Sequence, residues 1–173
     1  MDGTLFQTNL ILEPALEQTF NYLRQQGLWS CATPIEQYRQ IMGVPLNVVW
    51  ETLCPNHSKE TQEQSNEHFQ LALIEQIQQG NGALYSDVLT TLKKLSERYP
   101  IYIASNGQPA YLQAIVQYYR LDRWIKEVYS IECVDTNNKS HLVEFIMKEQ
   151  QINKGFVVGD RASDINAAID NNL

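Results

Sequence analysis

The sequence predicts an α/β fold in which a doubly wound parallel sheet carries an inserted α-helical domain. From residue 83 onward, short apolar segments alternate with helical segments, which is the pattern of a parallel sheet covered by helices. Residues 10–82 show helical periodicity and no alternation with a period of two. Gly80-Asn81-Gly82 separates the two regions. The expected domains are therefore 1–9 with 83–173, and 10–82.

Length and composition are those of a globular chain with one domain, or one domain and a small insert. The chain has 173 residues, of which 43% are hydrophobic and 19% charged. A net charge of −7 argues against nucleic acid as a partner, although local cations can still hold a small anion. Cys31, Cys54 and Cys133 are odd in number and widely spaced, so we expect reduced thiols. No signal peptide or membrane-length apolar run is evident, which predicts a cytoplasmic protein that does not act at a membrane.

Residues 10–82 are expected to form about four helices. Apolar side chains recur at helical spacing over 16–23, and four apart on one face over 67–79. Thr33-Pro34 places a candidate N-cap before a proline at the first helical position. Between these helices, interruptions are expected at Gly27, Gly43, Pro45 and residues 55–58, with a short helix opening at 46–50.

The α/β region is expected to alternate strands and helices in order along the chain. A helix capped by Ser86 or Asp87 precedes an apolar strand over 101–104, and Pro109 begins a helix that ends at Tyr119. In a doubly wound sheet, ligands bind at the carboxyl ends of the strands. The remaining elements are strands over 127–131 and 156–158, and helices over 141–150 and 163–169.

Polar residues follow the expected strands. Ser105, Asn106 and Gly107 come directly after the strand over 101–104. Asp160 follows 156–158, and Asp164 lies four residues later. Lys139 opens a helical pattern, and Asp2 stands in Met1-Asp2-Gly3-Thr4-Leu5, which reads as a loop leaving a strand. Because these points converge on one edge of the sheet, we expect a single site.

The residue types at this edge suit a metal ion and a phosphate group. Carboxylate oxygens such as those of Asp160 and Asp164 are the ligands that Mg²⁺ prefers. The Ser105 hydroxyl and backbone N–H groups at a helix N-terminus form a phosphate cradle. Each residue also has a simpler interpretation. Asp164 caps the last helix, Asp160 is a turn residue, Ser105 is a strand-to-helix cap and Lys139 is a solvated lysine.

Taken in order, these segments resemble the four motifs of the haloacid dehalogenase superfamily. Met1–Leu5 resembles the first motif, Ile101–Gly107 the second and Phe156–Ile165 the fourth, and Lys139 stands at the lysine of the third. The resemblance spans the whole chain, although residues 10–80 carry none of it in detail. It implies a Rossmann-like core with an α-helical cap, and it points to the phosphoglycolate phosphatase branch.

The resemblance also implies a reaction, namely hydrolysis of a small phosphate monoester through an aspartyl-phosphate with Mg²⁺. Asp2 would act as general acid and base, and its backbone carbonyl would coordinate the metal. Asp160 would be a direct metal ligand, and Asp164 a ligand or a residue that orients one. Lys139 would hold the phosphate and offset the carboxylates, and residues 105–107 would bind the same group.

Some positions depart from the family pattern. The nucleophilic aspartate of the family falls one residue before Met1, outside the 173 residues, so we expect this chain to have lost most or all turnover while still binding Mg²⁺ and phosphate weakly. Asn137-Asn138 stands where the family often has glycine. Arg161 stands where a small residue is common, and it either touches substrate or points to solvent.

Two functions of different class follow. The first is a Mg²⁺-dependent phosphatase acting on a small phosphorylated metabolite as a monomer or homodimer. The second is an inactive pseudoenzyme or binding module that keeps the fold. Phosphomutase and dehalogenase chemistry stay open on the same scaffold, but a dehalogenase would not need Asp160 and Asp164 as metal residues, so the pair favours phosphate.

Overall fold

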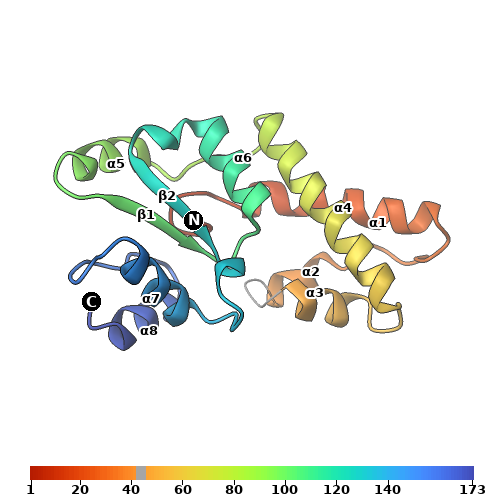
Figure 1. Cartoon of the computed structure of the whole chain (residues 1–173). Helices are drawn as coiled ribbons and strands as arrows, with labels where there is room; N and C mark the ends of the chain where they lie inside the picture. Colours follow the sequence, from red (N-terminus) through yellow and green to blue (C-terminus); the bar gives the residue numbers. More distant parts are fainter. Residues whose placement is uncertain (42–45) are drawn as a thin grey trace. The chain divides into compact units, whose positions relative to one another are not determined.

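The computed structural model of the chain describes residues 1–41 and 46–173, which form two compact units (Figure 1). The α/β unit comprises Met1–Thr8 and Ala83–Leu173, and the helical unit comprises Asn9–Gly82. The core and cap roles expected for these two units stay predictions. The predicted helix breaks at Gly43 and Pro45 lie outside the described residues.

Two parallel strands form the sheet of the α/β unit. They are β1 (Ile101–Ser105) and β2 (Ile125–Ser130), and their register places Ser105 opposite Ser130. Parallel strands connected through a helix confirm the α/β class. The second strand begins two residues earlier than predicted and ends one residue earlier.

The helices of the α/β unit begin at residues that favour a helix start. Pro109 opens its helix as predicted, because its fixed φ suits the first helical position. The helix expected over 141–150 begins earlier, at Lys139, because the side chain of Asn138 accepts a hydrogen bond from the Ser140 N–H at 2.8 Å. The helices described in this unit are α5 (Val88–Ser96), α6 (Pro109–Tyr119), η1 (Leu121–Arg123), η2 (Ile131–Cys133), α7 (Lys139–Glu149) and α8 (Ala162–Asp170).

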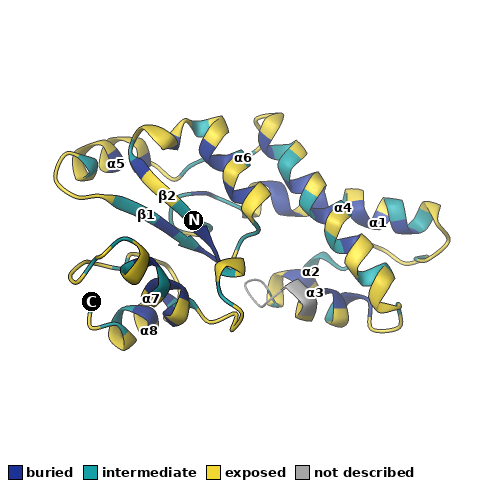
Figure 2. Cartoon of the chain, in the orientation of Figure 1, coloured by how far each residue is buried: buried dark blue, intermediate teal, exposed yellow. Residues whose placement is uncertain are grey.

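The core of the α/β unit lies where helices cover the two strands. Leu142 and Ile146 on one face of α7 pack with Tyr129 of β2. Leu112 and Ile115 of α6 are fully buried. The buried faces of these elements are seen in Figure 2. Burying each such aliphatic side chain contributes about 1.5–3 kcal/mol, so this packing fixes the elements that carry the site.

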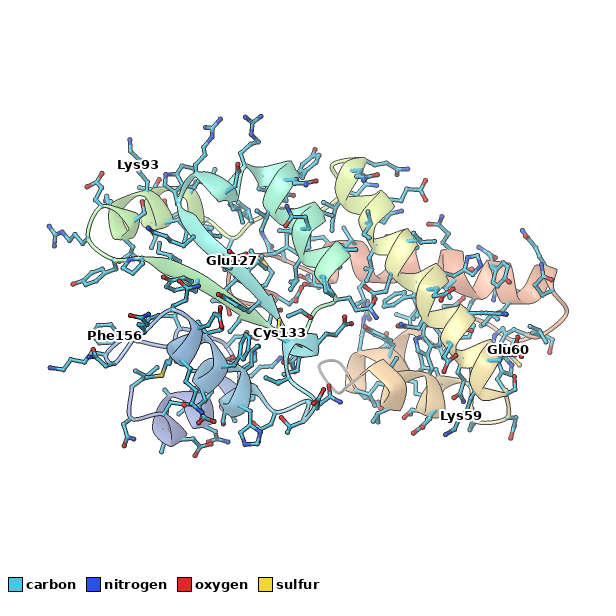
Figure 3. The ribbon with its side chains drawn as sticks, viewed as in Figure 1. Lys59, Glu60, Lys93, Glu127, Cys133 and Phe156 are labelled. Atoms are coloured by element: carbon cyan, nitrogen blue, oxygen red, sulfur yellow. The ribbon has the colours of Figure 1, made fainter. Side chains whose placement is uncertain are left out.

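The predicted strand over 156–158 is wrong. The segment has no regular structure, and Phe156 and Val158 are 89% and 79% exposed. Phe156 lies in the loop between α7 and α8 (Figure 3). A strand forms only where its backbone N–H and C=O groups pair with a neighbour. Among residues 1–41 and 46–173, the sheet contains β1 and β2 only, so apolar composition alone does not make this segment a strand.

The helical unit packs around aromatic side chains. The ring of Phe20 lies 6.3 Å from that of Trp50, which lies 5.9 Å from Phe69. The helix predicted over 67–79 begins much earlier because Ser58 accepts a hydrogen bond from the Thr61 N–H and caps it. The prediction of Thr33 as N-cap and Pro34 as first helical residue is wrong by one position, because the helix starts at Ile35 and Pro34 holds the N-cap position without a side-chain cap. The helices are α1 (Asn9–Gln25), α2 (Ile35–Gln40), α3 (Leu46–Leu53) and α4 (Lys59–Gln78).

Within the described parts of both units, no helix combines the length and the apolar character that crossing a membrane requires.

Candidate active site

The segment Met1–Thr8 is the centre of the candidate site. The carbonyl of Met1 accepts hydrogen bonds from the N–H groups of Leu5 and Phe6 at 2.8 and 3.1 Å. Phe6 is fully buried and forms isolated bridges with Asp2 and with Leu84. This turn is therefore held at both ends, and it presents Asp2 and Thr4 to the rest of the α/β unit.

Asp2 accepts two hydrogen bonds on one oxygen. Thr8 Oγ1 and the Tyr111 hydroxyl each donate to Asp2 Oδ1 at 2.5 Å. Tyr111 stands in the first turn of α6 and is buried. The predicted general acid is thus fixed against the helix that follows β1.

Asp160 lies directly against the first turn of the chain. The Thr4 hydroxyl donates to Asp160 Oδ1 at 3.0 Å. Gly3 has a φ of +71°, and a Cβ at this position would stand 2.2 Å from Asp160 Oδ2. Only glycine tolerates both the backbone conformation and this approach. The Asp160 side chain is still 38% exposed, with Arg161 Nε 3.9 Å from Oδ2.

Lys139 and Asp164 form an ion pair that is shielded from solvent. Lys139 Nζ donates to Asp164 Oδ1 at 2.7 Å, and the two side chains are only 12% and 11% exposed. The Arg161 N–H donates to Asp164 Oδ2 at 3.0 Å. Burial by itself raises the pKa of Asp164, but the hydrogen bond and charge of Lys139, with the Arg161 N–H, outweigh it and lower the pKa overall. Asp164 therefore also serves as a cap of α8, the simpler role considered for it.

Ser105 and Gly107 form a closed turn at the end of β1. Ser105 is buried, and its Oγ accepts a hydrogen bond from the Gly107 N–H at 3.2 Å. Across the strand pair, Ser130 Oγ donates to the Gly107 carbonyl at 2.7 Å. Ser105 does not cap α6, because the N-cap position belongs to Gln108. Asn106 is exposed at the tip of this turn.

Four of the predicted residues lie around Met1. Burial lowers the pKa of the Met1 α-amino group, and the charges of Asp2, Lys139, Asp164 and Asp160 all act on it, with Lys139 lowering and the carboxylates raising the pKa. The motifs at residues 2, 139, 160 and 164 therefore meet in space. Their catalytic and metal-binding roles stay predictions, as do those of residues 105–107.

The donor atoms fit a hard cation held by few protein ligands. Over residues 1–41 and 46–173, no group of three or more His, Cys, Asp or Glu side chains could hold a metal ion. Mg²⁺ needs only one or two carboxylates and keeps several waters. Asp160 suits this role because its carboxylate is anchored by Thr4 and partly open to solvent. Asp164 suits an orienting role, since its two oxygens are engaged by Lys139 and Arg161.

Several contacts of the site were not predicted from the sequence. Thr4 belongs to the first motif, but its hydrogen-bond partner Asp160 lies 156 residues later in the sequence. Nothing in the sequence pairs Asp2 with Tyr111. Ser130 could have been found, because it lies beside the end of the strand predicted over 127–131, as Ser105 lies beside the end of the strand predicted over 101–104.

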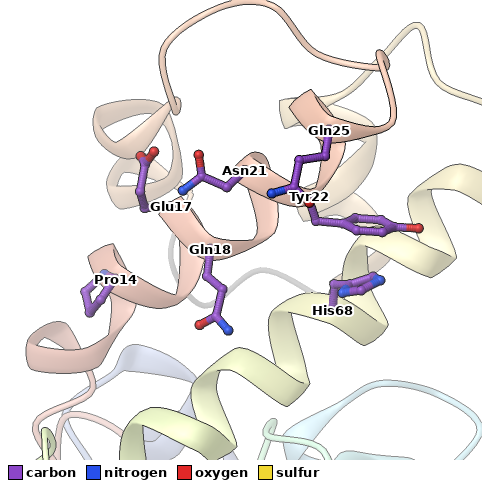
Figure 4. Close-up of a pocket in the computed structure, with 7 residues that line it drawn as sticks. All are labelled: Pro14, Glu17, Gln18, Asn21, Tyr22, Gln25 and His68. Atoms are coloured by element: carbon purple, nitrogen blue, oxygen red, sulfur yellow. The ribbon is translucent and has the colours of Figure 1, made fainter.

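The helical unit contains a polar pocket between α1 and α4 (Figure 4). Tyr22 and His68 stack there with ring centroids 3.6 Å apart. Gln18 and Asn21 add carboxamides, but both already bond to other side chains of this unit, Glu75 and Arg24. This pocket contains none of the predicted site residues.

Comparison with known proteins gives a family and a set of similar folds. The haloacid dehalogenase-like hydrolase family matches residues 1–173. A haloacid dehalogenase-like family hydrolase from Streptococcus pneumoniae is 17% identical with a TM-score of 0.73, over 100% of this chain and 79% of that one. A predicted phosphatase from Clostridium acetobutylicum is 16% identical with a TM-score of 0.74, over 100% and 79%. A HAD-superfamily hydrolase of subfamily IA from Geobacter sulfurreducens is 14% identical with a TM-score of 0.67, over 99% and 80%. Comparison with curated protein sequences gives no significant match.

Proposed function

The chain belongs to the haloacid dehalogenase-like hydrolase family, and from this premise we propose that it is built as a Mg²⁺-dependent phosphatase of the phosphoglycolate phosphatase-like branch. The substrate would be a small phosphate monoester. The observation that carries the proposal is the meeting of Asp2, Lys139, Asp160 and Asp164 around Met1. The ammonium group of Lys139 suits a phosphoryl group, and Mg²⁺ needs only one or two carboxylates, of which Asp160 can supply one.

Different residues would bind the metal ion and the phosphoryl group. Asp160, held by Thr4, would coordinate Mg²⁺ together with the backbone carbonyl of Asp2. When bound, Mg²⁺ would offset the negative charge of the phosphoryl group. Asp164 holds Lys139 in place through the 2.7 Å ion pair, so the ammonium group stays at the site when no phosphate is bound. The Ser105 hydroxyl and the backbone N–H groups of residues 106–107 would donate hydrogen bonds to the phosphoryl oxygens.

Asp2 would move the protons. In the first step the phosphoryl group passes to an aspartate, the bond to the leaving oxygen breaks, and Asp2 gives that oxygen its proton. In the second step Asp2, now ionised, takes a proton from water as the water attacks the aspartyl-phosphate and releases phosphate. Asp2 gives up one proton in the first step and takes one back in the second, so the cycle balances.

We place the nucleophilic aspartate at the position one residue before Met1. Support comes from the Met1 nitrogen, which is buried beside Asp2 and the other charged groups, so a residue joined to it would enter the same cluster. The position can be tested with an extended chain, in which an apolar strand ending in aspartate is joined to Met1. The family resemblance of Met1–Leu5 motivates this placement.

The decisive test of the metal assignment is the Asp160→Asn variant of the extended chain. We expect Mg²⁺-dependent phosphate release from small phosphate monoesters to fall roughly 10- to 100-fold or more, the scale seen when groups that hold or orient a metal are removed. Asp122→Asn is the control, because Asp122 is an exposed carboxylate of the same unit in η1. Equal activity in both variants would reject the assignment of Asp160.

A catalytically inactive binding module is the second candidate. It is supported by the Lys139–Asp164 ion pair, which holds a cationic group at the site where it could bind an anion without any covalent step. Isothermal titration of the 173-residue chain with Mg²⁺ and inorganic phosphate separates the cases. Binding combined with no turnover in the extended chain would favour the module, whereas turnover in the extended chain would exclude it.

A further inference from the structure

We propose that Tyr111 is a positioning residue for Asp2. Its hydroxyl holds the Asp2 carboxyl in the orientation from which Asp2 protonates the leaving oxygen. This inference rests on the proposed function, because it assumes that Asp2 is the general acid. It concerns a residue of α6 that lies outside the four motifs.

The two carboxyl oxygens of Asp2 differ in the hydrogen bonds that they accept from Tyr111 and Thr8. Tyr111 and Thr8 both donate to Oδ1 at 2.5 Å, and their own oxygens lie 3.4 Å apart. Two donors that approach one oxygen from different directions prevent the carboxyl group from rotating about its bond. Oδ2 takes part in neither bond, so it is the oxygen from which a proton is transferred. Proton transfer needs this kind of fixed geometry within hydrogen-bond reach.

Tyr111 is well placed to hold a carboxyl because its own position is fixed. It is buried in the first turn of α6, beside the fully buried Leu112. A Cβ on Gly107 would stand 3.1 Å from the ring carbon Cδ1 of Tyr111, so the turn after β1 packs closely on this ring. A phenylalanine would fill the same volume. The hydroxyl is therefore the part of Tyr111 that packing does not explain, since a buried hydroxyl is unfavourable unless it is hydrogen-bonded.

The same contact could instead serve only to join α6 to the first turn of the chain. The two roles differ in what the hydroxyl changes. A contact that only joins α6 to the first turn affects stability and lowers activity equally for all substrates. A positioning role affects the step in which the leaving oxygen takes a proton, and hence affects poor leaving groups more than good ones.

The first measurement uses the 173-residue chain and needs no turnover. The ¹³C resonance of the Asp2 carboxyl is followed by NMR in the chain and in Tyr111→Phe. Tyr119→Phe is the matched control, because Tyr119 lies on the same helix and its buried hydroxyl has no hydrogen-bond partner among the described residues. We expect the ¹³C chemical shift of the Asp2 carboxyl to change in Tyr111→Phe and to stay the same in Tyr119→Phe. An unmoved resonance in Tyr111→Phe would overturn the proposal.

The second measurement uses the extended chain with two substrates, an alkyl phosphate and p-nitrophenyl phosphate. For Tyr111→Phe we expect kcat/KM on the alkyl phosphate, which covers the steps up to phosphoryl transfer, to fall by about 10- to 100-fold, a fraction of the roughly 10²- to 10⁴-fold that general acid catalysis supplies. On p-nitrophenyl phosphate, whose leaving group needs no proton, we expect less than about a threefold change in kcat/KM, because the later hydrolysis of the aspartyl-phosphate does not enter this ratio. An equal loss on both substrates would assign Tyr111 a structural role and overturn the proposal.

Asp2→Asn distinguishes failure of this inference from failure of the proposed function. If Asp2→Asn shows no dependence on the leaving group, or if the extended chain has no phosphatase activity, the proposed function fails and the positioning role fails with it. If Asp2→Asn shows the dependence and Tyr111→Phe does not, only the role of Tyr111 is wrong. Thermal melts of each variant identify any that fail to fold, and Tyr111→Leu then serves as a second variant that has a smaller apolar side chain and no hydroxyl.

Discussion

Replacing Lys139 by methionine should destabilise the α/β unit far more than the same change at another lysine of α7. Lys139 and Asp164 are 12% and 11% exposed and 2.7 Å apart, so removing the ammonium group leaves a shielded carboxylate with the Arg161 N–H as its remaining donor. Breaking a buried ion pair by removing one partner costs about 3–5 kcal/mol. For a chain of this size, each kcal/mol lowers the melting temperature by about 2–4 °C.

Lys148→Met is the matched control. Lys148 bonds Glu144 at 2.5 Å on the same helix, but the two side chains are 73% and 48% exposed. Exposed pairs contribute little because water screens them and the long side chains lose freedom. We therefore expect no measurable change in the urea midpoint for Lys148→Met and a clear decrease for Lys139→Met. Equal midpoints for the two variants would refute the account of this ion pair.

The effect of Lys139→Met should also depend on pH. The pKa of Asp164 is lowered in the folded chain, so its ionised form contributes stability above the unfolded pKa of about 3.9, and this stability is lost as pH falls through the folded pKa. The difference in the free energy of unfolding between the chain and Lys139→Met should be largest at pH 7 and should decrease below about pH 4. Urea unfolding at a series of pH values measures it, and a difference that stays constant down to pH 3 would contradict the assignment.

Three further outcomes are expected. Gly3→Ala should destabilise the chain more than Gly27→Ala. Both glycines have φ near +70°, where alanine is strained by about 1–2 kcal/mol, but only a Cβ on Gly3 would also meet a neighbouring carboxylate, that of Asp160. Equal urea midpoints for the two variants would contradict the close approach of Asp160 to Gly3. Phe156→Ser should change stability by less than about 0.5 kcal/mol because the ring is 89% exposed; a large loss in a thermal melt would place it in the core. Burial raises the pKa of the Cys54 thiol to about 11, so a thiol reagent at pH 8 should label the two exposed cysteines quickly and Cys54 slowly; three equally fast thiols would refute its burial.

The local elements of the α/β unit could be predicted because their start signals lie in adjacent residues. Pro109 fixes the start of α6, and the turn at Gly107 follows a short apolar strand. Such signals act over a few residues and need no knowledge of the fold. The segment 156–158 shows the limit of this reasoning. Its composition suits a strand, but strand formation depends on a neighbour that local sequence does not reveal.

The candidate site was predictable as a set of positions but not as a set of contacts. Spacing after the expected strand over 156–158 pointed to Asp160 and Asp164, and both lie near Met1 although that segment forms no strand. Spacing did not indicate that Asp164 would bond Lys139 while Asp160 would bond Thr4. These pairings depend on how α7, α8 and the first turn pack, so a one-dimensional pattern cannot assign an orienting role to one aspartate and a metal role to the other.

Mg²⁺-dependent phosphate release by the extended chain, compared with a version whose added aspartate is alanine, tests whether the nucleophile lies next to Met1. We expect release only with Mg²⁺ and only with the aspartate, and we expect the intact mass of the protein during turnover to show a phosphoryl group bound to that aspartate. Equal release by the 173-residue chain itself, or by the alanine version, would contradict the placement of the nucleophile next to Met1.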